Sequence, residues 1–334
     1  MTKEKPQIGR RRYISGAVSV VISAFAGCND SRRTAEDTSG DSNKSATPNS
    51  DEPKGVEKAR RRIKLVYRQL DRFPIVEGGE FSFDIQRFDE EFDREQILTQ
   101  TEAAERILRG SDSSTKTSDE ITRLLAATRL AEYRIKQRIL IYRTIVAGMT
   151  YRNLLRESEY ETATKAIRDG RRFLEQLQTV GKQAESELQT LGRAEIVGYD
   201  RESIHQTQKI LIEVTQWTSS AYRGFHDIVR GFGRLQLANP EIEAGNFKQA
   251  GRYYAEANEF FADAEAALDR THGYNQKLER LAQLVTEFRC MLPTLQEGCD
   301  DLQTMFETVD PESEEIPEGT RETLIEMRNR IDEC

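Results

Sequence analysis

Two short motifs in the chain place a carboxylate and an imidazole three residues apart, a spacing that suits metal binding. They are Glu202-x-x-His205 and Asp269-x-x-His272. Residues three apart share one face of a helix, and two such motifs on facing helices can hold a pair of metal ions in a helical bundle. The second motif has Asp in place of Glu and ends beside Gly273, at the expected end of a helix. A metal-binding bundle is therefore the least favoured alternative, and we expect no cofactor.

The sequence lacks the other common patterns of catalytic chemistry. It contains no Gly-x-Ser-x-Gly, no glycine loop for phosphate, no His-Glu-x-x-His and no calcium loop. The remaining histidine, His226, has no serine or cysteine near it in a nucleophile motif. These observations favour a binding or structural protein over an enzyme.

Helices must position any functional side chains, because apolar residues recur at every third or fourth position through most of the chain after Lys54. The predicted helices cover residues 56–73, 85–108, 117–149, 158–191, 200–239, 246–272, 275–309 and 320–334. The short connections predict an all-α protein, either a multi-helix bundle or stacked antiparallel helical hairpins, with about eight helices. If the helical region divides into two subdomains, the boundary falls near 192–200.

Turn and capping residues mark the ends of these helices. Thr117–Glu120 and Ser158–Glu161 have the capping-box pattern, in which a hydroxyl and a Glu carboxylate bind the first free backbone N–H groups. The segment Pro74–Phe83 is expected to be a loop. Pro240 and Pro293 are expected to end or bend their helices.

Many aromatic residues and three glycines lie inside these helices. The aromatics could line a ligand groove, but their helical spacing favours a core; they are Trp217, Tyr222, Phe225, Phe232, Tyr253, Tyr254, Phe260 and Phe261. Gly224, Gly231 and Gly233 are expected to allow close helix contact or a bend.

One helix pair resembles a known repeat. The segment Gly245–Ala250, followed by Tyr253, Tyr254 and Ala257, resembles the second helix of a tetratricopeptide repeat, where alanines seven apart allow close helix packing. Fewer positions of this pattern recur at Tyr160, Ala163, Ile167 and Gly170. Ala163 and Ala250 are not separated by a multiple of the repeat's 34 residues, so we favour a non-repeating bundle over a repeat array.

The N-terminus carries a targeting pattern. Arg10-Arg11 followed by Tyr13-Ile14 resembles a twin-arginine export signal, and Phe25-Ala26-Gly27-Cys28 resembles a lipobox, although that family prefers Leu at the position of Phe25. The apolar segment 13–27 is shorter than the roughly 20 residues of a spanning helix. The resemblance implies that Cys28 becomes a lipid-bearing N-terminus on the outer face of the membrane. The alternatives are an uncleaved signal anchor and a basic N-terminus beside a buried strand.

These features divide the chain into three parts: 1–28 as export signal, 29–53 as tether, and 54–334 as helical domain. The tether is rich in Ser, Thr, Asp and Asn and lacks large apolar residues, so it cannot form a core. Asn43 lies in a glycosylation sequon, which a Ser-rich segment also produces by chance.

The charge balance bears on possible partners. The whole chain has 49 basic and 57 acidic residues, and loss of residues 1–27 leaves 44 and 56, a net charge of −12. This balance argues against nucleic acid as the main partner. The excess of Arg over Lys, the export signal and the acidic chain together resemble secreted proteins of halophilic archaea.

Three cysteines besides Cys28 lie in the last 45 residues, and disulfides persist in the compartment that the signal implies. If the last two helices form a hairpin about residue 313, Cys334 lies opposite residue 292. This register favours Cys290–Cys334 over Cys299–Cys334. No neighbouring His or Cys-x-x-Cys supports a zinc site.

The sequence thus predicts a lipid-anchored, extracytoplasmic helical protein that binds a partner protein or stabilises an envelope assembly, with no catalytic activity. A lipoprotein that binds a solute or small ligand is the main alternative. That class usually mixes strands with helices, and this chain shows almost no strand pattern.

Overall fold

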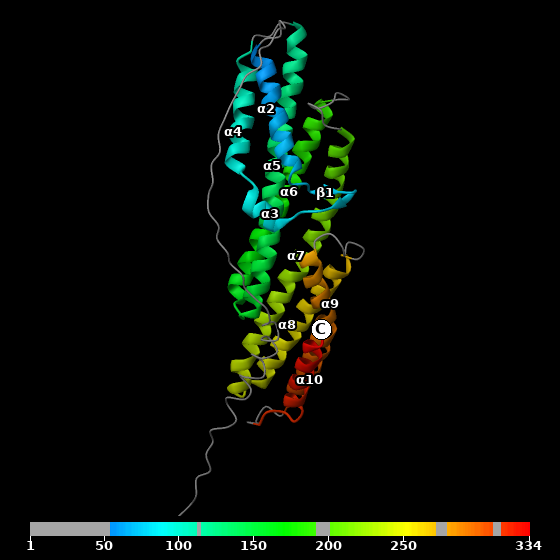
Figure 1. Ribbon diagram of the computed structural model, residues 1–334. Helices are drawn as coiled ribbons and strands as arrows, with labels where there is room; N and C mark the ends of the chain where they lie inside the picture. The colour runs from blue at the N-terminus through cyan, green and yellow to red at the C-terminus, as the bar shows by residue number, and fades with distance from the viewer. Residues whose placement is uncertain (1–53, 112–114, 192–200, 272–278, 310–314) are drawn as a thin grey trace, which may run out of the picture.

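The computed structural model describes residues 54–111, 115–191, 201–271, 279–309 and 315–334, which form an elongated helical bundle (Figure 1). Nine helices lie in these residues, which confirms the predicted all-α class. Their bounds are α2 Lys54–Asp71, α3 Ile85–Glu91, α4 Arg94–Arg109, α5 Thr115–Arg156, α6 Tyr160–Thr190, α7 Arg201–Glu243, α8 Phe247–Asp269, α9 Glu279–Glu307 and α10 Thr320–Asp332. No helix within the described ranges is long and apolar enough to cross a membrane.

Helices α5 and α6 form an antiparallel hairpin. Ser158, with a φ of 60°, lies in the turn between them. Two contacts fix the register: Arg129 Nη1 lies 3.5 Å from Glu187 Oε1, and the Arg143 guanidinium lies 5.7 Å from the centroid of the Phe173 ring. Both pairs are equidistant from Ser158 in sequence. Residues of α5 and α6 at equal distances from Ser158 therefore face each other.

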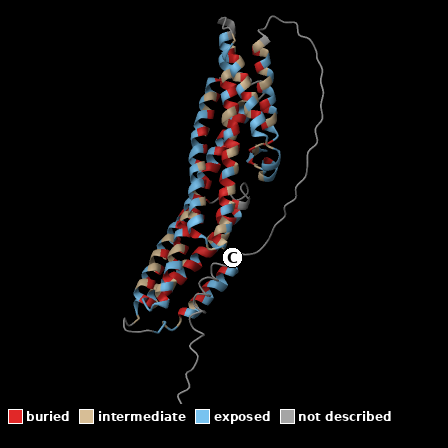
Figure 2. Ribbon diagram, turned by 90° about the vertical axis from the view of Figure 1, so that its left-hand side faces the viewer, coloured by how far each residue is buried: buried red, intermediate tan, exposed pale blue. Residues whose placement is uncertain are grey.

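Buried apolar residues form two clusters, which we call the upper and lower cores after their places in Figure 1. The upper core joins α2, α4, the first half of α5, the end of α6 and Ile204. The lower core joins the rest of α5, α6 and α7 to α8, α9 and α10. Figure 2 shows the buried residues along the inward faces of the helices. Leu191 and Ile204, on either side of residues 192–200, both belong to the upper core, so the two cores are not divided there.

Glycines bring α7 close to α8 in the lower core. A Cβ atom on Gly224 would lie 2.7 Å from Leu268 Cδ2, and one on Gly231 would lie 2.4 Å from Phe261 Cε1. Both separations are too short for carbon atoms. A Cβ atom on Gly233 would have no neighbour within 4 Å. The predicted close contact is thus confirmed for Gly224 and Gly231, whereas Gly233 makes none.

The predicted aromatic residues belong to the core. Six are buried and Tyr253 and Phe260 are half-buried; the six are Trp217, Tyr222, Phe225, Phe232, Tyr254 and Phe261. The turn between α7 and α8 has Gly245 at a φ of 76°, and Ala250 and Ala257 are fully buried. Helices α5 and α7, with 42 and 43 residues, are each longer than a whole tetratricopeptide repeat of about 34 residues.

Three local predictions were wrong. The expected loop Pro74–Phe83 contains a short hairpin of strands β1 Val76–Glu77 and β2 Glu80–Phe81, which is possible because Gly78 and Gly79 adopt positive φ. The expected helix 85–108 is two helices, because the Asp93 side chain accepts a hydrogen bond of 2.8 Å from Gln96 N and caps α4.

The third wrong prediction concerns the capping boxes. Helix α6 has Glu159 at its N-cap without a side-chain hydrogen bond, and α5 begins at Thr115, before Thr117.

Pro240 and Pro293 do not end their helices, because they lie inside α7 and α9.

A buried arginine joins α5 to the end of α2. Arg138 donates to the carbonyl oxygens of Phe73 at 2.8 Å, Leu70 at 3.0 Å and Arg134 at 3.0 Å. The carbonyls of Leu70 and Phe73 lie at and just after the end of α2, where few backbone donors remain and the helix dipole favours a cation; that of Leu70 also accepts a hydrogen bond of 3.2 Å from Phe73 N. Burial, followed by the nearby Arg134, lowers the pKa of Arg138 well below its ordinary value.

Candidate binding groove

The structure does not bring the two carboxylate-histidine motifs together. Glu202 and His205 lie exposed in the first turns of α7. Asp269 ends α8, and its Oδ1 accepts a hydrogen bond of 3.0 Å from Arg289. Trp217 Nε1 donates to the carbonyl of Thr271 at 2.9 Å, which places the end of α8 beside the middle of α7. His205 is 12 residues from Trp217, about 18 Å along the axis.

Several predicted site residues lie outside the described residues. They are His272, the export-signal residues Arg10, Arg11, Tyr13 and Ile14, the lipidation residue Cys28, and Asn43 in the tether. The described residues contain no group of three or more His, Cys, Asp or Glu side chains that could hold a metal ion.

The predicted cysteine pair is a disulfide. Cys290 on α9 and Cys334 after α10 are bonded, with their Cα atoms 5.7 Å apart. The register of the last hairpin follows the sequence prediction. Cys299 is free and buried, and burial, followed by the charge of Asp300, raises the pKa of its thiol. A buried neutral thiol is poorly suited to act as a nucleophile.

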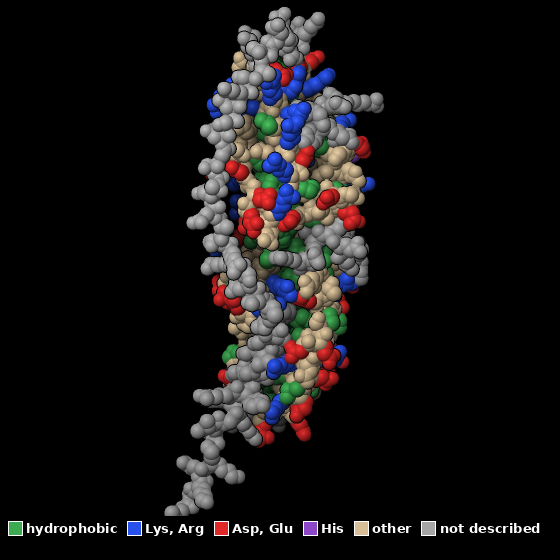
Figure 3. All heavy atoms as spheres, viewed as in Figure 1, with side chains coloured by type: hydrophobic (Ala, Val, Ile, Leu, Met, Phe, Trp, Pro, Cys, Tyr) green, Lys and Arg blue, Asp and Glu red, His purple; other side chains and the backbone are tan. Residues whose placement is uncertain are grey.

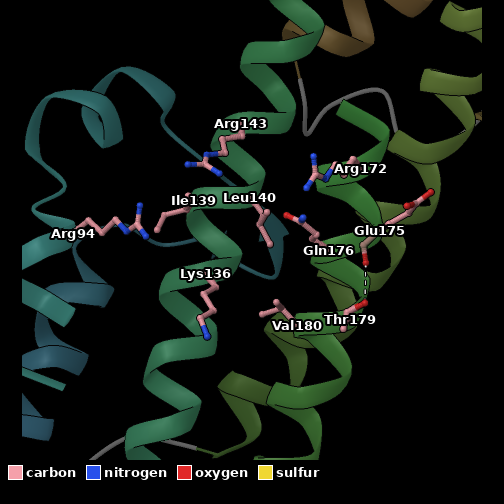
Figure 4. A pocket seen from close by; sticks show the side chains of 10 residues that line it. All are labelled: Arg94, Lys136, Ile139, Leu140, Arg143, Arg172, Glu175, Gln176, Thr179 and Val180. Atoms are coloured by element: carbon pink, nitrogen blue, oxygen red, sulfur yellow. Dashed lines mark hydrogen bonds between the residues drawn. The ribbon is translucent and has the colours of Figure 1, made fainter. Parts of the chain in front are cut away.

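A groove of about 540 Å³ runs between α4, α5 and α6 (Figure 4). Helix α5 supplies Lys136, Ile139, Leu140 and Arg143, helix α6 supplies Arg172, Glu175, Gln176, Thr179 and Val180, and α4 supplies Arg94 at its first residue. The α5–α6 register places Arg143 and Arg172 at the same end of the groove. Lys136 faces Val180 at the other end.

We call Arg94, Lys136, Arg143 and Arg172 the groove cations. All four are exposed, and none forms an ion pair with a carboxylate of the described residues. Two of them lie beside aromatic rings: the Arg143 guanidinium lies 5.7 Å from the Phe173 centroid, and Lys136 Nζ lies 5.4 Å from the Tyr133 centroid. Lys136 also lies near Glu132, and its charge opposes the rise that burial causes in the pKa of that carboxyl. The groove cations are therefore available to an anionic ligand.

Neighbouring arginines of α5 differ from the groove cations. Arg129 pairs with Glu187 at 3.5 Å, and Arg152 pairs with Glu287 at 2.5 Å. Arg60 and Arg61, in the charge run of α2, both pair with Glu57. Lys136 and Arg143, which lie between Arg129 and Arg152 on α5, form no such close pair.

The floor of the groove is apolar. Leu140 and Val180 are buried, and Ile139 is half-buried and packs against the upper core. Figure 4 shows the Arg94 side chain extending toward Ile139, whereas Glu175 points away from α5. An apolar floor edged by cations can bind a ligand that has both apolar and anionic parts.

The groove residues lack the parts of a catalytic site. Thr179 offers the one hydroxyl of the lining, and it donates to the carbonyl of Glu175 in its own helix at 3.0 Å. No histidine, cysteine or carboxylate pair of the lining could serve as base or nucleophile. The arrangement can bind and orient an anion.

Sequence reasoning missed the groove, because its residues come from three helices whose contacts the sequence does not reveal. One signal was present: Lys136 and Arg143 are seven residues apart and hence share a helix face about 10 Å long.

No protein-family model, curated protein or solved structure matches the chain.

Proposed function

We propose that the protein is a lipid-anchored, extracytoplasmic helical scaffold that binds an anionic region of a partner protein in the groove between α4, α5 and α6. The observation that carries this proposal is the set of four exposed groove cations, none of which forms a close ion pair with a carboxylate of the described residues. The anchor and the compartment come from the sequence pattern of residues 10–28.

Charge supports this choice of partner. Natural surfaces of one sign usually face a binding partner of the opposite sign, which speeds encounter and selects against wrong partners. The chain as a whole is acidic, with 57 acidic and 49 basic residues. The groove has the opposite charge, because four cations without close ion pairs lie beside it. Acidic side chains on the surface of a partner match the groove cations.

A small anionic solute is the second candidate, and the groove volume favours it. The volume of about 540 Å³ falls in the range of roughly 300 to 1,000 Å³ that ligand pockets occupy. However, all four cations are exposed, whereas ligand pockets bury most of their ligand. A protein partner, which brings its own surface to cover the cations, suits an exposed groove better.

The test is recovery of the partner from intact membranes in gentle detergent, with the full chain expressed in its own host. Wild type should co-purify with a partner in fixed proportion, and Arg143→Glu/Arg172→Glu should lose it. Arg168→Glu/Arg171→Glu is the matched control, because both residues are exposed on α6 outside the groove. Equal recovery with all three proteins, or recovery of a single unpartnered chain in each case, would contradict the proposal.

A further inference from the structure

The charges of the domain are unevenly distributed along the chain. Residues 54–209 have 29 basic and 26 acidic side chains, whereas residues 210–334 have 12 basic and 24 acidic. In Figure 3, Lys and Arg side chains gather over α2 in the upper half. The groove cations belong to the basic part of the chain, and α8, α9 and α10 belong to the acidic part.

Helix α9 presents a polar face that we call the acidic strip, composed of Asp300, Gln303, Thr304 and Glu307. Asp300, Thr304 and Glu307 are exposed and Gln303 is half-buried. Gln303 Nε2 donates to Glu307 Oε1 at 2.8 Å. Neither Asp300 nor Glu307 forms an ion pair with a cation of the described residues.

The acidic strip matches the groove in spacing. Asp300 and Glu307 are seven residues apart on α9, as Lys136 and Arg143 are on α5. Seven helical residues span about 10.5 Å, so both carboxylates could meet both cations when α9 lies along α5. Such pairs, partly covered by the two surfaces, gain more from their mutual attraction than exposed pairs do.

One copy cannot join its own strip to its own groove. Gly148 on α5 lies against Leu281 on α9, and Arg152 pairs with Glu287, so the two helices run in the same direction from this contact. The groove lies about eight residues before Gly148, whereas Asp300 lies 19 residues after Leu281. The two surfaces are therefore about 40 Å apart along the rod.

We infer that the anionic partner of the groove is a second copy of this chain, with Lys136 and Arg143 of one copy paired to Asp300 and Glu307 of the next. This inference rests on the proposed function. The two surfaces differ, so the contact is heterologous and extends into open rows unless a rotation closes it. The proposed anchors hold neighbouring copies at the same membrane, which raises their effective concentration.

Zero-length cross-linking tests the contact directly. Equal amounts of isotope-labelled and unlabelled full chain, placed together in lipid vesicles, are treated with a carbodiimide, which joins a lysine amine to a carboxylate. Mass spectrometry should find Lys136 linked to Asp300 or Glu307 in peptides that combine labelled with unlabelled chains. Links confined to one chain, or the absence of any Lys136 link to α9, would overturn the inference.

A charge exchange provides the second test, read as the particle mass of the full chain in detergent. Lys136→Glu/Arg143→Glu and Asp300→Lys/Glu307→Lys should each weaken self-association at least about tenfold. Mixing the two variants should restore association, because the unchanged strip of the first meets the unchanged groove of the second, and the reversed strip of the second meets the reversed groove of the first. Arg168→Glu/Arg171→Glu should associate like wild type.

The outcomes separate this inference from the proposed function. Folded variants, judged by unchanged helical circular dichroism, that stay apart on mixing would overturn the self-association. If wild type stays monomeric but a different protein co-purifies with it through Arg143 and Arg172, the inference fails and the proposed function stands. If neither a second copy nor another protein depends on the groove, both fail.

Discussion

The upper and lower cores differ in the kinds of side chain that they bury. Most of the largest fully buried side chains are aromatic residues of the lower core, namely Tyr151, Tyr222, Tyr254, Phe225, Phe232, Phe261, Phe288 and Phe306. The upper half has a fully buried arginine, Arg138, and buried polar contacts link its helices. Tyr67 Oη donates to the carbonyl of Ala127 at 3.0 Å, and Gln137 Nε2 donates to Gln208 Oε1 at 2.7 Å.

The same long helices are therefore stabilised by different interactions in the two halves of the molecule. Interlocked aromatic rings fill volume, so the lower core should depend on shape and respond strongly to cavities. Buried polar contacts satisfy particular backbone groups, so the upper half should depend on a few hydrogen bonds that fix where α2 ends on α5. The groove lies where the two cores meet: Leu140 and Val180 of its floor belong to the lower core, and Ile139 packs against the upper core.

Of the substitutions proposed for the two cores, Phe225→Ala should lower the stability of the protein most, because it removes a ring from the lower core. The ring is fully buried, and its centroid lies 5.3 Å from that of Tyr151 and 5.7 Å from that of Phe288. We expect a loss of about 3 to 5 kcal/mol in the free energy of unfolding by urea. Phe92→Ala, which removes a half-buried ring near the upper core, should cost clearly less. Equal losses would contradict the comparison.

Arg138→Met should destabilise the upper half, because the carbonyl oxygen of Phe73 loses its donor and that of Leu70 keeps only the hydrogen bond of 3.2 Å from Phe73 N. We expect a loss of about 1 to 3 kcal/mol in the free energy of unfolding, the cost of one unsatisfied buried group. Amide hydrogen exchange should speed up in α2 and remain slow in α8. Uniform faster exchange across both helices would show that the two halves unfold as one unit.

Two glycines of α7, Gly231 and Gly233, test whether the lower core depends on shape. Gly231→Ala should destabilise the protein by about 1 to 3 kcal/mol, because the new methyl group meets Phe261. Gly233→Ala should stabilise it by about 0.5 to 1 kcal/mol, because space is open there and Ala is the better helix former. Thermal melts of the pair measure the difference. The same sign for both substitutions would refute the close-contact account.

The smallest effect is expected in the groove. Lys136→Glu/Arg143→Glu should change the free energy of unfolding by no more than about 0.5 kcal/mol, because both side chains are exposed and a carboxylate at position 136 adds only a weak repulsion with Glu132. Urea unfolding of the variant beside wild type provides the measurement. A loss comparable to that of Arg138→Met would mean that the groove cations hold the fold together.

Much of the fold could be predicted from the sequence, because apolar residues spaced three and four apart identify helix faces directly. Val56, Ala59, Ile63, Val66 and Leu70 have this spacing, and all five are buried on α2. The break before α4 was also readable, since Asp93 stands three residues before Gln96 as a capping residue does. The strands β1 and β2, with two residues each, are too short to show alternation.

The groove and the role of Arg138 depend on which helices are neighbours. Arg138 was visible as a charged residue between Ile135 and Ile139 in an apolar pattern, but the pattern does not reveal that α2 ends beside it. Arg94 and Arg172 are 78 residues apart in sequence and meet at the groove because α4 and α6 both flank α5. Periodicity describes one helix at a time, so a site shared by three helices remained hidden.

The central claim is that the groove receives an anionic partner, and site-specific photocross-linking tests it most directly. A photoreactive residue is placed at Arg172 in the groove or at the adjacent Arg171, which is exposed on α6 outside it. Illumination of intact membranes should give a discrete adduct of higher mass from position 172 and not from position 171. No adduct from either position, or equal adducts from both, would contradict the claim.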